Sequence, residues 1–478
     1  MTLDVRAGYG GSPMRDLARS RGIWVGRIGT SPSAGQVWFR WSGAGRARPG
    51  GDGRLKTTLT VPEGQHHDLV LEISDRPLRQ PPVDSGDAWV ATEEAWAGAV
   101  PNCDGLVAAR DAAHAHTVLT GLTSASGGMV AAATTSLAER LDGTRNYDYR
   151  YAWIRDQCYA GIAMAAQGCQ SQLAATVRFI ADRVLADGPD LKPAYTAGGE
   201  QIPGERALRL PGHPGSSVRV GNRVLRQFQL DSLGEVLQLL AAAAGLDVLD
   251  ADGPRAAEVA AIATATTPGG APPGGAGARA AARWSALADK ITADMGKAIH
   301  PTGRWKRAEC DERVDAALLP SVLRDAIPAE DPRSVATVAA VAAELADDGF
   351  IYRFRHDNRP LYEAEGAFLL CGFWMALTAH VRGDDVEAAH WFERNRAGAV
   401  QPAFTPRSTT CSSGSCAGIS RRRSCTRPCS SALCACPAAR GSVVRRTGRL
   451  PDCAVIGRGR WVSNGFASTT DRTRKGTG

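Results

Sequence analysis

The chain has 478 residues, 44% of them hydrophobic and 22% charged, an ordinary composition for a globular protein of two or three domains. No stretch approaches the roughly 18 consecutive apolar residues that a membrane-spanning helix needs. The first residues, Met1–Ala7, contain no apolar core of a secretory signal, so we expect a cytoplasmic protein without a membrane partner.

The net charge of +7 is unevenly distributed along the chain. From Gly398 onward there are 14 Lys and Arg against 2 Asp, whereas the preceding part has 42 Lys and Arg against 47 Asp and Glu. Five of the 12 cysteines lie in the first 397 residues, scattered as in a reducing compartment, and seven lie in the last 81. The body is therefore mildly acidic, and its charge does not predict a nucleic-acid partner.

The N-terminal part, residues 1–83, has the pattern of a β domain. Apolar and polar residues alternate in four segments bounded by Gly and Pro, which is typical of half-buried strands. The predicted strands are residues 22–28, 36–41, 55–61 and 68–73.

From residue 84 onward the apolar period becomes helical. A linker helix is expected over 84–117. Asp231 stands as a candidate N-cap before four apolar residues with one-face spacing, namely Leu233, Val236, Leu237 and Leu240. A helix is predicted over Ser334–Asp348 with Gly349 as its stop, and another, apolar all round and therefore buried, over Gly366–Val381.

Two segments interrupt this pattern. Residues 264–280 are a low-complexity run of Thr, Pro, Gly and Ala inside an otherwise helical region. After Arg396 the sequence has no usable period and becomes rich in Ser, Arg and Cys, so we expect disorder there.

Several motifs occur in the order of one known family. They are Leu122–Leu137, Asn146–Asp156, Val220–Asp231, Arg313–Leu319 and Glu365–Trp374. With these motifs the chain resembles glycoside hydrolase family 15, the trehalase and glucoamylase family, over roughly residues 5–396. Within that family it is most similar to the mycobacterial-type trehalases, which implies trehalose as the sugar substrate.

The resemblance implies a mixed fold. The expected parts are an incomplete β-sandwich at 1–83, the linker helix at 84–117, an incomplete (α/α)6 barrel at 118–397 with a gap at 264–280, and a disordered basic tail at 398–478. It also implies hydrolysis of an α-glucosidic bond with inversion, a reaction that needs no metal or organic cofactor.

The resemblance assigns sugar binding to Arg155 and Asp156, with Trp153 as an aromatic wall. An Arg fork and a carboxylate offer directional donors and acceptors to vicinal hydroxyls. From the spacing alone, a structural ion pair at a helix start is the more frequent explanation, and the surrounding motif reverses that preference.

Three further residues have two interpretations each. Asp231 is either a sugar ligand or a helix cap, and Glu365 is either a pocket carboxylate or a structural residue. His213 lies on a turn that could rim a pocket, although an ordinary loop position is the more frequent case.

The two catalytic glutamates of the family have no matching position. The general acid is expected in a Trp-Glu motif, in the interval that here holds residues 264–280, which contain neither Trp nor Glu. The general base is expected in a Glu-Glu-Tyr-Asp motif after the Phe-Glu-Arg sequence that begins at Phe392. Glu365, or its neighbour Glu363, is the remaining candidate carboxylate.

The expected base motif reappears in another reading frame. Permitted codons for residues 404–427, read two bases in, encode His-Pro-Glu-Glu-Tyr-Asp followed by Gly-Asn and Pro-Gln-Ala-Phe in register. We infer a frameshift between about Arg396 and Phe404, which also explains the Arg and Cys of the tail. Its cysteine spacings do not suit a zinc site, and its arginines lack the interleaved aromatics of a single-strand binder.

Three hypotheses therefore remain at the level of sequence. The chain is a working trehalase or glucosidase that uses Glu363 or Glu365, a noncatalytic sugar-binding remnant, or the product of a decayed gene without function.

Overall fold

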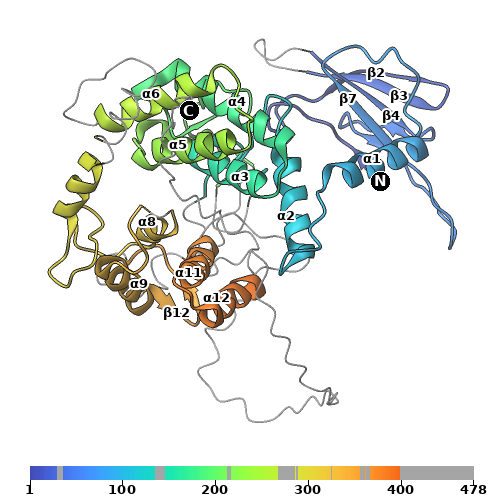
Figure 1. Ribbon diagram of the computed structural model, residues 1–478. Coiled ribbons are helices and arrows are strands. Elements are labelled where there is room, and N and C mark those ends of the chain that lie inside the picture. Colours follow the sequence, from blue (N-terminus) through green and yellow to red (C-terminus); the bar gives the residue numbers. More distant parts are fainter. Residues whose placement is uncertain are drawn as a thin grey trace, which may run out of the picture. The chain divides into compact units, whose positions relative to one another are not determined.

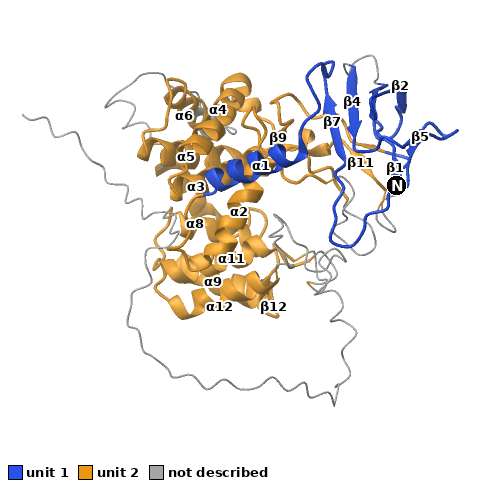
Figure 2. Ribbon diagram, turned by 90° about the vertical axis from the view of Figure 1, so that its right-hand side faces the viewer, with its two compact units in different colours: residues 1–100, 208–211 blue, residues 101–207, 212–478 orange. Residues whose placement is uncertain are grey.

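A computed structural model describes residues 1–29, 36–134, 146–210, 212, 217–266, 286, 289–324, 326–355, 361 and 366–398. The chain forms two compact units, one of residues 1–100 with 208–211 and one of residues 101–207 with 212–478, coloured separately in Figure 2. Within the described residues, no helix is long and apolar enough to cross a membrane.

The first unit is built around a four-stranded antiparallel sheet in the order β2-β3-β4-β7 (Figure 1). Its strands are β2 (Met14–Ser20), β3 (Ile23–Ile28), β4 (Val37–Ser42) and β7 (Val70–Ser74). A smaller sheet has the order β1-β6-β5, from Thr2–Leu3, Leu55–Lys56 and Arg48–Pro49. Leu55 of this sheet belongs to the same apolar cluster as Trp24, Phe39 and Trp41, so both sheets share one core.

The strands of this unit differ in part from the sequence prediction. The strand expected over 55–61 is reduced to Leu55–Lys56, and β2 was not expected at all. Most of β2 is exposed, so its sequence has no alternating pattern, and it is held by pairing with β3 instead.

Arg40 is the one charged side chain of the first unit's described residues that is buried, at 6% exposure. Its guanidinium donates to both carboxylate oxygens of Glu72 at 2.6 Å. It also donates to the carbonyl oxygens of Gln80 and Pro81, at 2.5 and 2.9 Å. These bonds satisfy the buried cation and fasten the segment before α1 (Ser85–Ala99) to the sheet.

The second unit is mainly helical. Two helices, α1 of the first unit and α2 (Ala109–Leu122), occupy the region where one linker helix was predicted. The further helices are α3 (Ile154–Ala166), α4 (Gln170–Asp187), α5 (Leu230–Gly245), α6 (Gly253–Thr266), α8 (Leu319–Leu323), α9 (Pro332–Leu345), α11 (Leu369–Val381) and α12 (Asp385–Gly398). Short antiparallel pairs join β8 (Ala152–Trp153) to β9 (Ala194–Tyr195), β10 (Arg206–Ala207) to β11 (Arg219–Val220), and β12 (Ala346–Asp347) to β13 (Phe350–Ile351).

These helices enclose two separate apolar cores. The first core consists of buried residues between positions 152 and 260, mainly from α3, α4, α5 and α6. The second consists of buried residues between positions 314 and 391, from α8, α9, α11, α12 and the segments between them. The two clusters have no member in common. The packing inside each core therefore does not connect them, and other contacts do.

Two helix ends differ from the sequence prediction. Asp331 caps α9 through the backbone N–H of Arg333, and the helix ends at Leu345 rather than Asp348, because residues 346–347 enter a hairpin. Gly349, with a φ of 73°, lies in that hairpin and not at the helix stop. The helix predicted over Gly366–Val381 begins at Leu369. Its fully buried residues lie on one side of the helix and the opposite side is only partly buried, so the all-round burial that its apolar sequence indicated holds in part.

Gly372 of α11 provides the first test of this packing. A Cβ at this position would overlap the side chain of buried Asn395 on α12. We expect Gly372→Ala to lower the free energy of unfolding by about 1–3 kcal/mol through overpacking. The control is Gly234→Ala in α5, where a Cβ meets nothing within 4 Å and the gain in helix propensity should be neutral or stabilising. Equal effects of the two changes in urea denaturation would contradict this prediction.

Candidate sugar-binding site

The site begins from a buried carboxylate, that of Asp148, which is fully inaccessible to solvent. Its Oδ2 accepts from the Nη2 of Arg150 at 2.8 Å and from the backbone N–H of Gly221 at 3.1 Å. The backbone carbonyl of Asp148 accepts from the side chain of Asn222 at 3.2 Å. A buried charge requires such partners, and here one is the nearby Arg150 while the other, the backbone of Gly221, is 73 positions away in the sequence.

Further bonds join the same two segments. Asn146 donates to the carbonyl oxygen of Ser217 at 2.6 Å, and the hydroxyl oxygen of Tyr151 accepts from the N–H of Gly221 at 3.1 Å. Gly221 has a φ of 75°, and a Cβ there would overlap the backbone of residues 203–204, so only glycine fits. The motifs Asn146–Asp156 and Val220–Asp231 therefore lie together, because the first supplies the carboxylate and the second the backbone donor.

The charge state of Asp148 follows from these contacts. Burial by itself would raise the pKa of this carboxyl group, but the hydrogen bonds and positive charge of Arg150 outweigh burial and lower it below its usual value. Burial and the neighbouring Asp148 charge raise the pKa of Tyr151 to about 12. Asp148 is consequently an anion and Tyr151 a neutral phenol near neutral pH.

The structure brings Arg155, Asp156 and Asp231 together at the beginnings of α3 and α5. The Nη1 of Arg155 donates to Asp231 Oδ2 at 3.0 Å and to Gln229 Oε1 at 3.2 Å. The Nε of Arg155 lies 3.6 Å from Asp156 Oδ1. The side chains of Arg155 and Asp231 are 30% and 49% exposed, so this group can be reached by a dissolved ligand.

Two details of this group differ from the sequence interpretation. Asp231 is not a helix cap, because α5 begins at Leu230 after Gln229, and the Asp231 carboxylate in the first turn binds Arg155 instead. Trp153 precedes α3 and is buried at 7% exposure, with its ring centroid 5.9 Å from that of Tyr149. Little of Trp153 is therefore open to solvent, which leaves little of its ring for contact with a sugar.

Glu365, Glu363 and His213 lie outside the described residues, as do residues 267–285 and the tail from residue 399. The assignment of Glu365 as a pocket carboxylate therefore stays a prediction.

Sequence reasoning missed a second polar group, one helical turn from Arg155 along α3. It consists of Tyr159 of α3, Glu235 of α5 and Arg324, which follows α8. Arg324 forms a bidentate ion pair with Glu235, and its guanidinium carbon lies 5.0 Å from the ring centroid of Tyr159. The Tyr159 ring is in turn 6.1 Å from that of Trp374 on α11.

Burial controls the titration of this second group. Burial raises the pKa of Glu235, opposed by the hydrogen bond and charge of Arg324, and the nearby Asp231 charge raises it further. Burial and the Glu235 charge also raise the pKa of Tyr159. One sequence signal was available: Glu235 is a charged residue on the same helix face as buried Leu239, four positions on, which indicates a buried partner.

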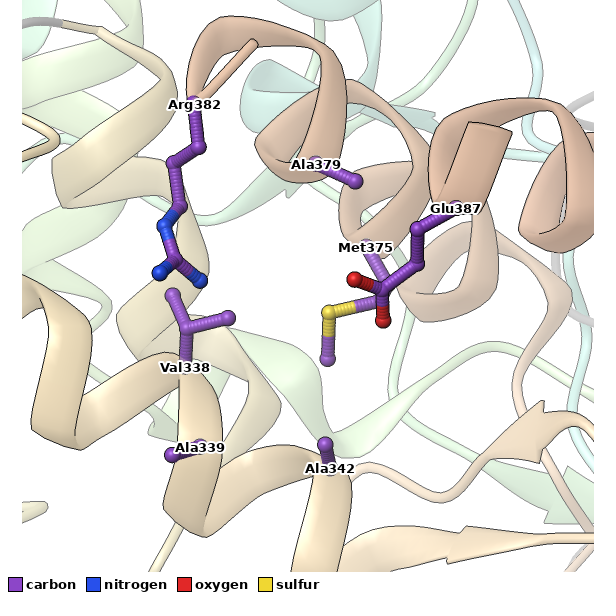
Figure 3. A pocket seen from close by; sticks show the side chains of 7 residues that line it. All are labelled: Val338, Ala339, Ala342, Met375, Ala379, Arg382 and Glu387. Atoms are coloured by element: carbon purple, nitrogen blue, oxygen red, sulfur yellow. The ribbon is translucent and has the colours of Figure 1, made fainter. Parts of the chain in front are cut away.

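A cavity of about 210 Å³ lies elsewhere in this unit, between α9, α11 and α12 (Figure 3). Its lining residues are Val338, Ala339, Ala342, Met375, Ala379, Arg382 and Glu387. None of them belongs to the groups around Arg155 or Glu235, so the cavity is not part of the candidate site. The described residues contain no group of three or more His, Cys, Asp or Glu placed to hold a metal ion.

The chemistry of the exposed group suits a polyhydroxylated ligand. Arg155 supplies a planar fork of donors, and Asp156 and Asp231 supply acceptors beside it. Each hydroxyl of a vicinal pair can donate and accept a hydrogen bond. Such a pair can therefore replace the contacts between Arg155 and the two carboxylates and leave no charge without a partner.

Sequence comparison finds similar proteins of a known family. The sequence pattern of the glycosyl hydrolases family 15 matches residues 112–268 and 253–413. The trehalase of Mycolicibacterium smegmatis is 31% identical over 391 residues, which are 72% of this chain and 58% of that protein. The trehalase of Mycobacterium tuberculosis is 34% identical over 54% of this chain and 44% of its own length. The chain thus spans about half the length of these curated relatives.

A solved bacterial glucoamylase complexed with acarbose aligns with 84% of this chain and 70% of its own, at 13% identity and a TM-score of 0.46. The family match covers most of the helical unit and includes Arg155, Asp156 and Asp231. The chain is a glycosidase-type protein, with a sheet-rich N-terminal part followed by a helical region. It belongs to glycosyl hydrolase family 15.

Asp148→Asn tests the buried carboxylate that joins the two motifs. At neutral pH we expect the free energy of unfolding to fall by roughly 1–3 kcal/mol, because buried donors lose a charged acceptor. Since the folded-state pKa of Asp148 is lowered, its contribution is present above the usual Asp value, about pH 4, and is lost as the pH falls further.

The difference between Asp148→Asn and the unmodified chain should therefore shrink below about pH 4, as measured by urea denaturation over a pH series. Asp104→Asn, at an exposed position, is the matched control. A difference that stays constant down to pH 2 would contradict the assignment.

Proposed function

We propose that this chain is a family 15 glycoside hydrolase that acts on an α-glucosidic bond, with trehalose as the substrate. The observation that carries the proposal is the contact of Arg155 with Asp156 and Asp231 inside the region that matches the family. The naming of the similar mycobacterial proteins as trehalases supports the choice of trehalose over longer α-glucosides.

The proposed architecture is an incomplete β-sandwich followed by an incomplete (α/α)6 barrel. The shared apolar core of the two N-terminal sheets supports the sandwich. The consecutive helices of the second unit support the barrel. In this arrangement Arg155 and Asp231, at the starts of α3 and α5, would lie at the same end of the barrel.

Each site residue has a role in the proposed reaction. Arg155 and Asp156 hold hydroxyls of one glucose ring, and Asp231 orients Arg155 and accepts from a further hydroxyl. Inversion needs a protonated carboxyl group at the leaving oxygen and a second carboxylate, roughly 6.5–9.5 Å away, that activates water. The chain offers no family match for either of them, and Glu365 is the candidate substitute for one.

A second candidate function follows from the unmatched catalytic carboxyl groups. Without both glutamates the chain would bind the sugar and not cleave it, since loss of one catalytic carboxyl group costs orders of magnitude in rate. The absence of Trp and Glu from residues 264–280, and the frameshift inferred after Arg396, favour this noncatalytic alternative.

Binding and cleavage are separable by experiment. Isothermal titration calorimetry with trehalose should give heat with the unmodified chain, and Arg155→Gln should weaken binding roughly 10- to 100-fold, as expected for the loss of a charged hydrogen-bonding group. Arg178→Gln, at an exposed position on α4, is the control. Absence of heat with both trehalose and maltose would contradict sugar binding altogether.

Glucose release from trehalose decides between the two functions. Hydrolysis that Glu365→Gln abolishes would support the enzyme and the role of Glu365. Hydrolysis unchanged by that substitution would exclude Glu365 as a catalytic group. Binding without glucose release would support the noncatalytic alternative.

A further inference from the structure

The exposed and buried polar groups are stacked along the same two helices. On α3, Arg155 and Tyr159 are four residues apart, and on α5, Asp231 and Glu235 are four residues apart, so each pair shares a helix face. We call Arg155 with Asp231 the outer pair, and Tyr159, Glu235 and Arg324 the inner group. The Arg155–Asp231 contact, at 3.0 Å, therefore lies one helical turn from the inner group.

The two levels differ in their access to solvent. The side chains of the outer pair are 30% and 49% exposed, whereas those of Glu235 and Arg324 are 5% and 16% exposed. A dissolved sugar can therefore reach the outer pair more readily than the ion pair of Glu235 and Arg324. An effect of that ion pair on the ligand would accordingly act through the outer pair.

Arg324 comes from a different part of the helical unit. It follows α8, whose buried residues belong to the second core, and it is 89 positions from Glu235 in the sequence. Tyr159 contacts Trp374 of α11, which also packs against the second core. The inner group thus joins the helices of the first core, which carry the outer pair, to the second core.

A bidentate ion pair fixes direction as well as distance. The planar guanidinium of Arg324 accommodates both Glu235 oxygens in one orientation, and its carbon lies over the Tyr159 ring, 5.0 Å from the ring centroid. This restrains α5 against α3 one turn beyond the outer pair. Sub-ångström shifts between these helices would change the Arg155–Asp231 contact directly, because both residues lie in the first turns.

We propose that Arg324 is a positioning residue, which acts through Glu235 and Tyr159 to set the geometry of Arg155 and Asp231 for the ligand. The sugar-affinity part of this inference rests on the proposed function, whereas the geometric part does not. It assigns a role to a residue outside the motifs that carry the family resemblance.

The test compares two arginines of the same unit. Arg307, like Arg324, pairs with a carboxylate and an aromatic ring: it is 3.1 Å from Asp315, and its guanidinium carbon is 4.4 Å from the Phe354 ring centroid. Arg324→Met should weaken trehalose binding in calorimetry roughly 3- to 30-fold, a range typical of coupling through a packed network, whereas Arg307→Met should leave it unchanged. Equal affinities of both variants and the unmodified chain would overturn the proposal.

A second measurement does not depend on the ligand. The side-chain Nε–H signal of Arg155 in a ¹⁵N-labelled chain, assigned by its loss in Arg155→Lys, should shift or broaden in Arg324→Met and not in Arg307→Met. An unchanged signal in Arg324→Met would overturn the proposal even if no sugar binds. A shifted signal without trehalose heat in the unmodified chain would uphold positioning and contradict the proposed function.

A double variant covers the case in which Arg324→Met does not fold. Replacement of both partners, Glu235→Met with Arg324→Met, removes the uncompensated buried charge and should restore stability. If the pair only stabilises the fold, the double variant regains both stability and trehalose affinity. If the pair positions the outer pair, stability returns while the Arg155 signal stays displaced and the affinity stays low.

Discussion

The helical unit depends on the requirement that a buried carboxylate be paired. Asp148 has no exposed surface, and it obtains its donors from Arg150 and from the backbone of Gly221. Together with the bonds from Asn146 to Ser217 and from Gly221 to Tyr151, this pairing joins the segment before α3 to the segment before α5. Arg155 and Asp231 follow these segments, so the same contacts bring the candidate site together.

Glu235 is a second buried carboxylate that must be paired. Its partner Arg324 lies in the part of the chain that forms the second apolar core, while Glu235 lies in the first. Apolar packing explains the interior of each core, but it has no direction and does not specify how two cores meet. Among the described residues, the Glu235–Arg324 pair and the adjacent Tyr159–Trp374 contact provide a directional connection.

The parts of the fold that could be predicted are those in which local pattern and burial agree. Alternation located β3, β4 and β7 to within two residues, and helical spacing located α5, α9 and α11. Where burial and local pattern diverge the prediction was wrong or absent. Strand β2 is mostly exposed and exists through its pairing with β3, and α9 ends early because a hairpin competes for its last residues. Asp231 is a residue type that often caps a helix, yet it lies inside the first turn of α5 and its carboxylate binds Arg155.

In the site, the residues that could be predicted are those whose partners are close in the sequence. Arg155 and Asp156 could be named because one contiguous motif contains them, and the structure joins Asp231 to them. Glu235 carried a local signal, a charge on a buried helix face, but that signal names no partner. Arg324 carried none, since its role arises from a contact over 89 positions that no periodicity encodes. A contiguous motif can therefore identify the residues of a site without identifying the distant partner that restrains them.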